Sequence, residues 1–262
     1  MKILTFIIPT RNRYESLSRI INEIKNLNID IIIIDDNSNL DNKKKNYLLC
    51  KKFKKIKYFY LKKNFGQSFA LNIGVKHSKT KYVWFFDDDD FVNKSSVINV
   101  VDFLLKKKIE GLLIPMFIVY KNQVIEKIFP KVKEHKFKKL INGQQKVSTS
   151  CSIFELNIIK KIGGWDEKLA SGTDTDIFLR FSKKHNFSVF KKANVKVNYS
   201  ASNRVTNNLM KQLIGKIQIL IKHGQILSFR RIFYYIFTLV TFYPLFYNIK
   251  QNLKLAQLKK NV

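Results

Sequence analysis

Four consecutive aspartates, Asp87 to Asp90, directly follow the apolar segment 82–86, in a chain that has only 19 acidic residues in all. Neighbouring carboxylates repel one another and resist joint ionisation unless a cation lies among them. Carboxylate oxygens suit hard ions such as Mg²⁺ or Mn²⁺, which commonly bind substrate phosphates as well. The run therefore predicts a divalent metal site. The alternative is a solvated acidic turn.

Polar groups follow two other apolar segments in the same way. Residues 10–13 follow the segment 3–8, and the pair Asp35 and Asp36 follows the β-branched run 31–34. In open parallel sheets, ligands bind outside the carboxyl ends of the strands. If these segments are neighbouring strands, all three polar groups meet at one edge of the sheet and form one site.

The elements expected to position this site alternate in type along the first 107 residues. Apolar runs of strand length are separated by segments whose apolar residues recur with the 3.6-residue period of a helix. We expect strands at 3–8, 31–34, 56–61 and 82–86, and helices at 14–27, 67–77 and 95–107. This order predicts an α/β fold with a mainly parallel, Rossmann-like central sheet flanked by helices.

The rest of the chain is less regular. We expect strands at 110–120, 123–129 and 148–154, a loop at 163–165, a helix from about 174 to 185, and an amphipathic helix at 209–223. No repeat or linker marks a boundary before about residue 200. We therefore expect a catalytic domain at 1–203, with a nucleotide-binding half at 1–107 and an acceptor-side half at 108–203. A basic, aromatic-rich helical segment follows at 204–262.

Composition sets outer limits on function. Lys and Arg number 49, and the net charge is +30, so nucleic acid, anionic lipid and phosphorylated substrates are candidate partners. A genomic preference for Lys explains the charge equally well. Two cysteines without a CxxC spacing fit a reducing compartment. The apolar start is too short for a signal peptide and is expected to be the first strand.

Five motifs, in this order and spacing, resemble the inverting family 2 glycosyltransferases of the GT-A fold. The resemblance covers roughly residues 3–200. The matching segments are Ile8-Pro9-Thr10-Arg11-Asn12-Arg13, Ile34-Asp35-Asp36-Asn37-Ser38, Asn64-Phe65-Gly66-Gln67-Ser68 with Ala70 to Gly74, Phe86 to Asp90, and Gly163-Gly164-Trp165-Asp166-Glu167 with Thr173 to Asp176 and Arg180.

The resemblance implies a nucleotide-sugar donor, most simply a UDP-sugar, and a Mn²⁺ or Mg²⁺ ion. Asp36 would accept from the donor's base, while Thr10 and Arg11 would line the same pocket. Asp87 and Asp89 match the outer acids of the DxD motif of the family, with Asp87 facing ribose or metal. The implied donor-binding residues are Pro9, Thr10, Arg11, Asn12, Asp36, Asn64, Gly66, Asp87 and Asp88, and the implied metal ligands are Asp89 and Asp90.

The same resemblance makes Asp174 the base that takes the proton of the acceptor hydroxyl. The alternative is that Thr173 is an N-cap with Asp174 and Asp176 in the first helical turn. Thr173 also departs from the family, which often has Glu there. On the acceptor side we expect Trp165, as a sugar-stacking wall or a packed loop aromatic, and Asp176. The four histidines show no ligand spacing and are expected at the surface.

The C-terminal segment predicts contact with a membrane surface. An apolar stripe at 209–223 carries lysines beside it, and 232–249 is rich in Phe and Tyr, which favour the membrane interface. The alternatives are packing on the catalytic domain, a subunit interface in a homo-oligomer, and a true membrane span.

The resemblance implies sugar transfer to a carbohydrate or lipid-linked glycan acceptor, in surface polysaccharide or lipid-linked glycan synthesis. It would take place in the cytoplasm, peripherally at the inner face of the membrane. Two alternatives stay open: a metal-dependent nucleotidyltransferase and a basic nucleic-acid-binding protein. No nucleic-acid-binding motif is present, and the acidic loops would repel a phosphate backbone, so nucleic acid is not an expected partner.

Overall fold

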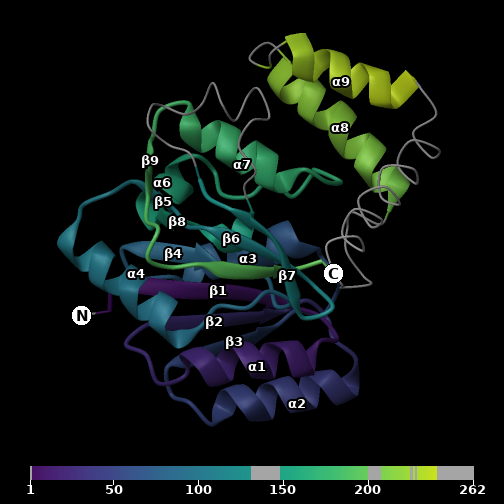
Figure 1. Cartoon of the computed structure of the whole chain (residues 1–262). Helices are drawn as coiled ribbons and strands as arrows, with labels where there is room; N and C mark the ends of the chain where they lie inside the picture. Colours follow the sequence, from purple (N-terminus) through teal and green to yellow (C-terminus); the bar gives the residue numbers. More distant parts are fainter. Residues whose placement is uncertain (1, 131–147, 200–207, 225–226, 228, 241–262) are drawn as a thin grey trace.

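The computed structural model describes residues 2–130, 148–199, 208–224, 227 and 229–240 of the chain. A seven-stranded sheet forms the centre, with helices on both of its faces (Figure 1). The first four strands in chain order are β1 (Leu4–Thr10), β2 (Asp30–Asp35), β3 (Ile56–Tyr60) and β4 (Tyr82–Phe85). They are mutually parallel and lie in the order β3-β2-β1-β4.

The sheet continues from β4 through β8 (Ser152–Glu155), β5 (Gly111–Leu113) and β9 (Phe187–Val189). Strand β8 runs antiparallel to both of its neighbours, so the sheet is mixed although mostly parallel. A smaller sheet contains β10 (Val195–Asn198), β6 (Met116–Tyr120) and β7 (Gln123–Ile128). The expected α/β fold with a mainly parallel sheet is confirmed, and so is the strand pair of the middle third.

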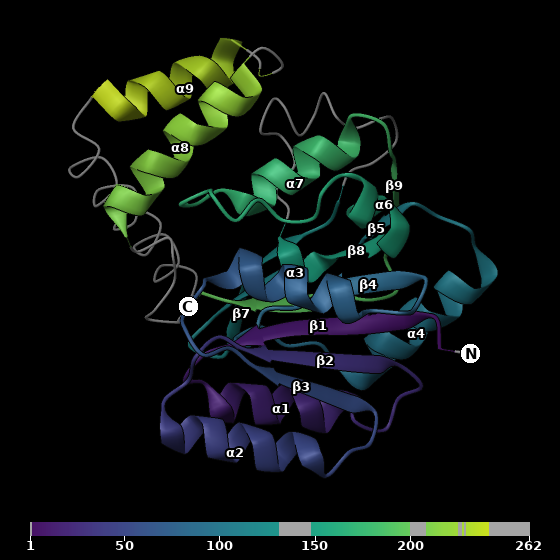
Figure 2. The ribbon, with the colours of Figure 1, turned by 180° about the vertical axis from the view of Figure 1, so that it is seen from behind.

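Helices fill the connections between the strands, and the view from behind shows α3 on the opposite side of the sheet from α1 and α2 (Figure 2). A short 3₁₀ segment, η1, spans Thr149–Cys151 and leads into β8. The helices are α1 (Tyr14–Ile24), α2 (Leu40–Lys51), α3 (Gln67–His77), α4 (Lys94–Lys106), α6 (Leu156–Lys161), α7 (Thr173–Ser182), α8 (Leu209–His223) and α9 (Phe229–Val240).

Alternation along the buried strands divides the core between the two faces of the sheet. In β1, Phe6 and Ile8 join a cluster with α1 and α4, whereas Ile7 joins a second cluster with α3, α6 and α7. Both sides of β1 and β2 are therefore covered, which is why these strands are continuous apolar runs. Gly74 of α3 lets that helix approach β1 closely, because a Cβ at this position would overlap the side chain of Ile7.

Helix α8 extends the second cluster rather than standing apart from it. Ile219 is only 1% exposed, and Leu227 and Tyr235 are buried with it. Packing on the catalytic domain, one of the alternatives for this segment, is thus what α8 does through one of its faces. The expected boundary at residue 203 lies outside the described residues, as do residues 241–249 of the aromatic stretch. Within the described residues, no helix is long and apolar enough to span a membrane.

We expect Ile219→Ala to loosen α8, with Ile221→Ala as the matched control on the same helix. Ile219 is 1% exposed and Ile221 is 80% exposed. Truncating a buried isoleucine costs roughly 2–5 kcal/mol, whereas exposed substitutions usually change stability by less than about 0.5 kcal/mol. Amide hydrogen exchange across residues 209–223 measures the difference. Equal protection in the two variants would contradict the packing described here.

Candidate active site

The carboxyl ends of β1, β2 and β4 bring three polar loops together. Thr10 of β1 is in register with Asp35 of β2, and Ile7 of β1 is in register with Phe85 of β4. The chain leaves each of these parallel strands at the same edge of the sheet. The loop after β1, Asp36 and the aspartate run therefore gather where ligands of open α/β sheets bind.

Asp88 is held by the loop that follows β1. The hydroxyl of Thr10 donates to Oδ2 of Asp88 at 2.8 Å, and Nη1 of Arg13 donates to Oδ1 at 2.7 Å. The same guanidinium nitrogen lies 3.2 Å from Oδ2 of Asp89. Burial raises the pKa of Asp88 to about 6, and the charge and hydrogen bond of Arg13 oppose that rise. Arg13 is thus the internal counter-charge of two of the four aspartates.

Arg13 belongs to one of the motifs that carry the family resemblance, but the resemblance alone implied no role for it. Its position directly after β1 indicates such a role, because β1 and β4 are parallel neighbours and the loops after them lie at the same edge of the sheet.

The carboxylate of Asp87 is hydrogen-bonded by a neutral side chain. Nε2 of Gln67 donates to its Oδ1 at 2.6 Å, and its backbone N–H donates to Oγ of Ser150 at 3.0 Å. Burial raises its pKa well above the usual value, and the charges of Asp90, Asp89, Asp174 and Asp88 add to the rise. Asp174 therefore lies within electrostatic reach of the aspartate run, although 84 residues separate Asp90 from it. A cation here would relieve this repulsion.

Asp174 is oriented by the segment η1. The hydroxyl of Thr149 donates to Oδ1 of Asp174 at 2.8 Å, and Ser150, the next residue, contacts Asp87. Helix α7 begins at Thr173 and is capped by Gly172, which has a left-handed φ of 75°. Interpreting Thr173 as the N-cap is therefore wrong, because Gly172 supplies the turn. Asp174 does lie in the first turn of the helix, where the macrodipole stabilises a carboxylate.

Asp36 joins two loops at the far side of the site. Its two oxygens accept from the backbone N–H groups of Phe65 and Gly66, both at 2.8 Å. Gly66 has φ 89°, which favours glycine, and its N–H also lies 3.2 Å from Oδ1 of Asn64. Each carboxylate oxygen has a second lone pair, so Asp36 can still accept from a ligand. Its contact with a nucleobase stays a prediction.

The remaining residues of the first loop differ in their roles. Asn12, with φ 55°, donates its N–H to Oγ of Ser38, and its Oδ1 accepts from the N–H of Asn39, both at 2.8 Å. It ties the loop after β1 to the loop after β2. Pro9 is buried within β1, and Arg11 is exposed beside the site. Arg11 is therefore an exposed cation on this loop, whereas Arg13 is partly buried.

Asp90 and Trp165 are more buried than their predicted roles suggest. Oδ1 of Asp90 accepts from the backbone N–H of Asn198 at 3.1 Å, so Asp90 braces β10. Trp165 is 3% exposed, and its ring meets Phe85 edge-on at a centroid distance of 5.1 Å. Trp165 is thus the packed loop aromatic of our two alternatives and not a sugar-stacking wall, because apolar neighbours cover its indole.

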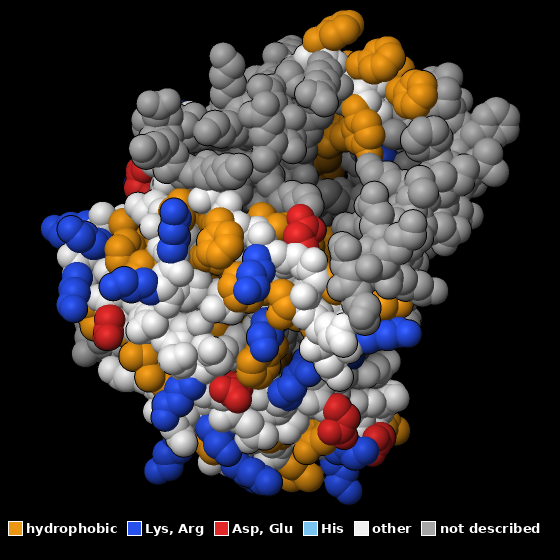
Figure 3. Space-filling model, viewed as in Figure 1, with side chains coloured by type: hydrophobic (Ala, Val, Ile, Leu, Met, Phe, Trp, Pro, Cys, Tyr) orange, Lys and Arg blue, Asp and Glu red, His pale blue; other side chains and the backbone are white. Residues whose placement is uncertain are grey.

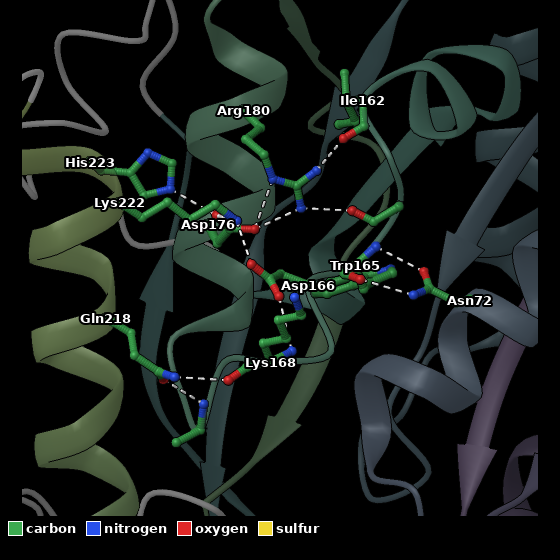
Figure 4. Close-up of polar contacts among 12 residues, drawn as sticks. Asn72, Ile162, Trp165, Asp166, Lys168, Asp176, Arg180, Gln218, Lys222 and His223 are labelled. Atoms are coloured by element: carbon green, nitrogen blue, oxygen red, sulfur yellow. Dashed lines mark hydrogen bonds and ion pairs between the residues drawn. The ribbon is translucent and has the colours of Figure 1, made fainter.

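Asp176 is a buried anchor and not an acceptor-side residue. Its carboxylate lies between Arg180 on its own helix and two cationic or ring nitrogens from α8 (Figure 4). The distances are 2.7 Å to Nη2 of Arg180, 2.7 Å to Nζ of Lys222 and 2.8 Å to Nε2 of His223. Despite burial, these hydrogen bonds hold the pKa of Asp176 below its usual value. Such a carboxylate is a poor base.

This cluster also corrects the expectation that the histidines lie at the surface. His223 is buried, and its Nε2 is hydrogen-bonded to Asp176 of α7, which satisfies the polar ring atom away from water. His185 contacts Glu110 through Nδ1 and is only partly exposed, whereas His77 is exposed. His135 lies outside the described residues.

No three His, Cys, Asp or Glu side chains within the described residues converge as a ready-made metal cage. The donors that do gather at the end of β4 are carboxylate oxygens. Mg²⁺ and similar ions are commonly held by only one or two carboxylates, with substrate phosphates and water completing the shell. The residues present therefore fit an ion that binds together with a phosphate-bearing ligand.

Comparison with known proteins gives a family match over more than half of the chain. The sequence profile described as "Glycosyl transferase family 2" matches residues 5–161. Poly(ribitol-phosphate) beta-N-acetylglucosaminyltransferase TarP of Staphylococcus aureus is 36% identical over 110 residues, which is 39% of this chain and 33% of that protein. GalNAc(5)-diNAcBac-PP-undecaprenol beta-1,3-glucosyltransferase of Campylobacter jejuni is 38% identical over 95 residues, 34% of this chain and 30% of that protein. The chain thus matches about a third of the length of each of these relatives.

A solved structure shares the fold across nearly the whole chain. Residues 1–349 of S. aureus TarS, in complex with UDP-GlcNAc, superpose with a TM-score of 0.68. The match covers 92% of this chain and 76% of the TarS chain, at 18% sequence identity. The similarity establishes the arrangement of the elements, including the mixed, mostly parallel sheet.

We expect Asp176→Asn to destabilise the protein, because it removes the charge of a fully buried carboxylate that pairs with partly buried Arg180 and with Lys222. Breaking a buried pair by removing one partner costs roughly 3–5 kcal/mol. Urea unfolding measures the loss. Asp41→Asn is the control, since Asp41 is an exposed partner of Lys45 and should change little. Equal midpoints for the two variants would contradict the anchoring role.

The pH dependence gives a second check on Asp176. A depressed folded-state pKa contributes stability that is fully present above the unfolded value of about 4, and the contribution is lost as the pH falls. Asp176→Asn should therefore flatten the fall in unfolding free energy below about pH 4. If the unfolding free energy of Asp176→Asn fell below pH 4 as steeply as that of the parent, the pKa of Asp176 would not be depressed.

Proposed function

Because the chain belongs to glycosyl transferase family 2, we propose that it transfers a sugar from a nucleotide-diphosphate sugar to an acceptor hydroxyl with inversion at the anomeric carbon. One observation carries this proposal: the consecutive residues Thr149 and Ser150 contact Asp174 and Asp87, so Asp174 lies beside the aspartate run at the edge where the loop after β1 and Asp36 also meet. A donor-binding acid cluster and a separate carboxylate for the acceptor are the two requirements of the reaction. Neither a nucleotidyltransferase nor a nucleic-acid-binding protein gives Asp174 a reason to lie there.

The loops after β1 and β2 would bind the nucleotide. Asp36 and Asn64 lie where a base could be recognised, and Arg11 is exposed beside them. A UDP-sugar is the donor we propose, in line with the UDP-GlcNAc complex of the structurally similar TarS fragment. Arg13 joins the donor-binding residues, because its guanidinium already lies against Asp88 and Asp89 and is able to pair with phosphate oxygens.

A divalent ion, Mn²⁺ or Mg²⁺, would be held by Asp89 with help from Asp87. Asp90, buried against Asn198, contributes charge and a brace for the turn in place of the direct ligation expected from the sequence. When bound, such an ion offsets the charge that grows on the departing diphosphate. Thr10 and Arg13 fix the orientation of Asp88 by donating one hydrogen bond to each of its oxygens.

The transfer itself needs a base on the face of the sugar opposite the diphosphate. The acceptor oxygen attacks the anomeric carbon, the bond from that carbon to the diphosphate oxygen breaks, and the acceptor proton passes to the carboxylate of Asp174. The hydrogen bond from Thr149 fixes the orientation of this carboxylate. Attack from the opposite face inverts the configuration.

The acceptor we propose is a carbohydrate or a lipid-linked glycan in surface polysaccharide synthesis. The two curated relatives carry names that specify a poly(ribitol-phosphate) and an undecaprenol-linked acceptor. An undecaprenol-linked acceptor is a lipid and partitions into a membrane. We therefore place the enzyme in the cytoplasm, peripherally at the inner face of the membrane. A homo-oligomer stays one of the alternatives for its assembly.

Asp89→Ala should abolish the Mn²⁺-dependent part of UDP binding, because it removes the accessible carboxylate proposed to bridge the ion. Isothermal titration with and without Mn²⁺ measures this part. Asp41→Ala, which removes an exposed carboxylate on α2, is the control and should bind as the parent protein does. An Asp89→Ala affinity equal to the parent's in Mn²⁺ would refute the metal assignment.

Asp174→Asn should keep UDP binding and lose transfer by on the order of 10²–10⁴-fold, the usual contribution of a general base. The amide preserves the shape and the hydrogen bond from Thr149 but cannot take the proton. Single-turnover transfer from a UDP-sugar, once a donor is identified by thermal shift, measures the rate. Thr149→Val should lower the rate less, since it misorients the base without removing it. Near-parental turnover of Asp174→Asn would rule out this base.

A further inference from the structure

The outer side of the α8–α9 pair exposes apolar side chains on both helices. On α8 they are Met210, Ile214, Ile217 and Ile221, and on α9 they are Phe229, Phe233, Tyr234, Ile236 and Phe237. We call these nine residues the outer face. Figure 3 shows hydrophobic side chains gathered at the top of the molecule, over this pair of helices. The side chains of Ile221 and Phe229 are 80% and 82% exposed, and a group of exposed apolar side chains marks an interaction site.

The spacing of these residues indicates a surface and not a collection of isolated exposed side chains. Positions 210, 214, 217 and 221 recur on one stripe of α8, and 229, 233, 236 and 237 recur on one stripe of α9. The opposite sides of both helices are already used, since Ile219 and Tyr235 belong to the core of the domain. Each helix is therefore apolar on two sides, and only one of them is covered in the described residues.

Polar contacts fix this pair on the catalytic domain. The side chain of Gln218 accepts from the N–H of Ala170 and donates to the carbonyl oxygen of Lys168, both at 2.8 Å. Lys222 and His223 meet Asp176, as described above. The outer face is thus presented in a defined orientation. It is attached to α7, the helix that begins beside Asp174, so whatever the outer face binds is held in register with the proposed base.

Charge distinguishes among the surfaces that could cover the outer face. No Asp or Glu follows Asp176 in the sequence, while residues 177–262 contain 16 Lys and Arg. Within the pair, Nζ of Lys216 lies 5.5 Å from the ring centroid of Tyr234, at the margin of the apolar face. A second copy would bring the same positive charge against this face. An anionic surface is complementary to it, and Phe and Tyr favour the lipid interface.

We propose that the outer face of α8 and α9 is a docking surface for an anionic lipid bilayer, on which the helices lie with their aromatic side chains inserted among the headgroups. The bilayer would be the membrane partner of the proposed transferase. Only the biological purpose of this binding rests on the proposed function. Lipid binding can be measured without donor, metal or acceptor, so failure of the surface and failure of the enzyme assignment are distinguishable.

The test uses the full chain with three serine substitutions, Ile221→Ser, Phe229→Ser and Phe233→Ser. All three side chains are exposed, so the substitutions leave the packed side of the pair intact. Deleting the segment would be a poorer test, because it would also uncover the core around Ile219. The matched control carries Leu40→Ser, Leu48→Ser and Leu105→Ser, three exposed apolar residues on α2 and α4.

Flotation with vesicles of phosphatidylcholine and phosphatidylglycerol gives the affinity, and pure phosphatidylcholine vesicles give the neutral reference. We expect the parent and the control to bind the anionic vesicles alike and the triple variant to bind on the order of 100-fold more weakly. Thermal unfolding of the triple variant should match that of the parent, which shows that the fold is kept.

Three results would overturn the proposal. The first is a parent protein that does not float with anionic vesicles, and the second is a triple variant that floats as well as the parent. The third is a parent that sediments as a dimer and a triple variant that sediments as a monomer, with no lipid binding by either. That third result would assign the outer face to a second copy of the chain.

Discussion

Concentrated negative charge at the end of β4 is the constraint around which the candidate site is organised. Four carboxylates follow one strand, and a fifth, on Asp174, is close enough to raise the pKa of Asp87. The protein offsets this repulsion in part, because Arg13 pairs with Asp88 and Asp89, while the carboxylate of Asp87 accepts a hydrogen bond from the neutral amide of Gln67. A site with this imbalance favours ligands that bring positive charge or arrive together with it.

The fold holds these charges close because it anchors their loops to one another. Asn12 joins the loops after β1 and β2, Asp36 joins the loop after β2 to the start of α3, and Thr10 joins β1 to the aspartate run. Each of these groups is polar and lies at the end of a strand that is buried on both faces. The buried strands therefore fix the starts of these loops, and the hydrogen bonds between the loops hold the loops in place relative to one another.

Much of this arrangement could be predicted from the sequence, and the exceptions have physical causes. The strands of the first half are uninterrupted apolar runs, so their order and the loops after them were visible. Helix α2 was not, because it buries only Asn46, Leu49 and Cys50 and shows no apolar stripe. The burial of Asp176 with His223 was equally hidden, since its partners come from a helix 47 residues away. Trp165 looked like a ligand-binding aromatic because sequence does not reveal which ring will be covered.

The segment η1 connects the aspartate run with the proposed base through contacts of two consecutive residues, Thr149 and Ser150. Thr149 holds Asp174, the hydroxyl of Ser150 holds the backbone of Asp87, and the carbonyl oxygen of Ser150 accepts from the indole N–H of Trp84 at 2.8 Å. Because Trp84 is part of the central sheet, this three-residue segment connects both Asp87 and the proposed base Asp174 to the sheet. Acceptor preference could therefore diverge among homologues through changes in the surrounding loops, while this connection of both residues to the sheet stays constant.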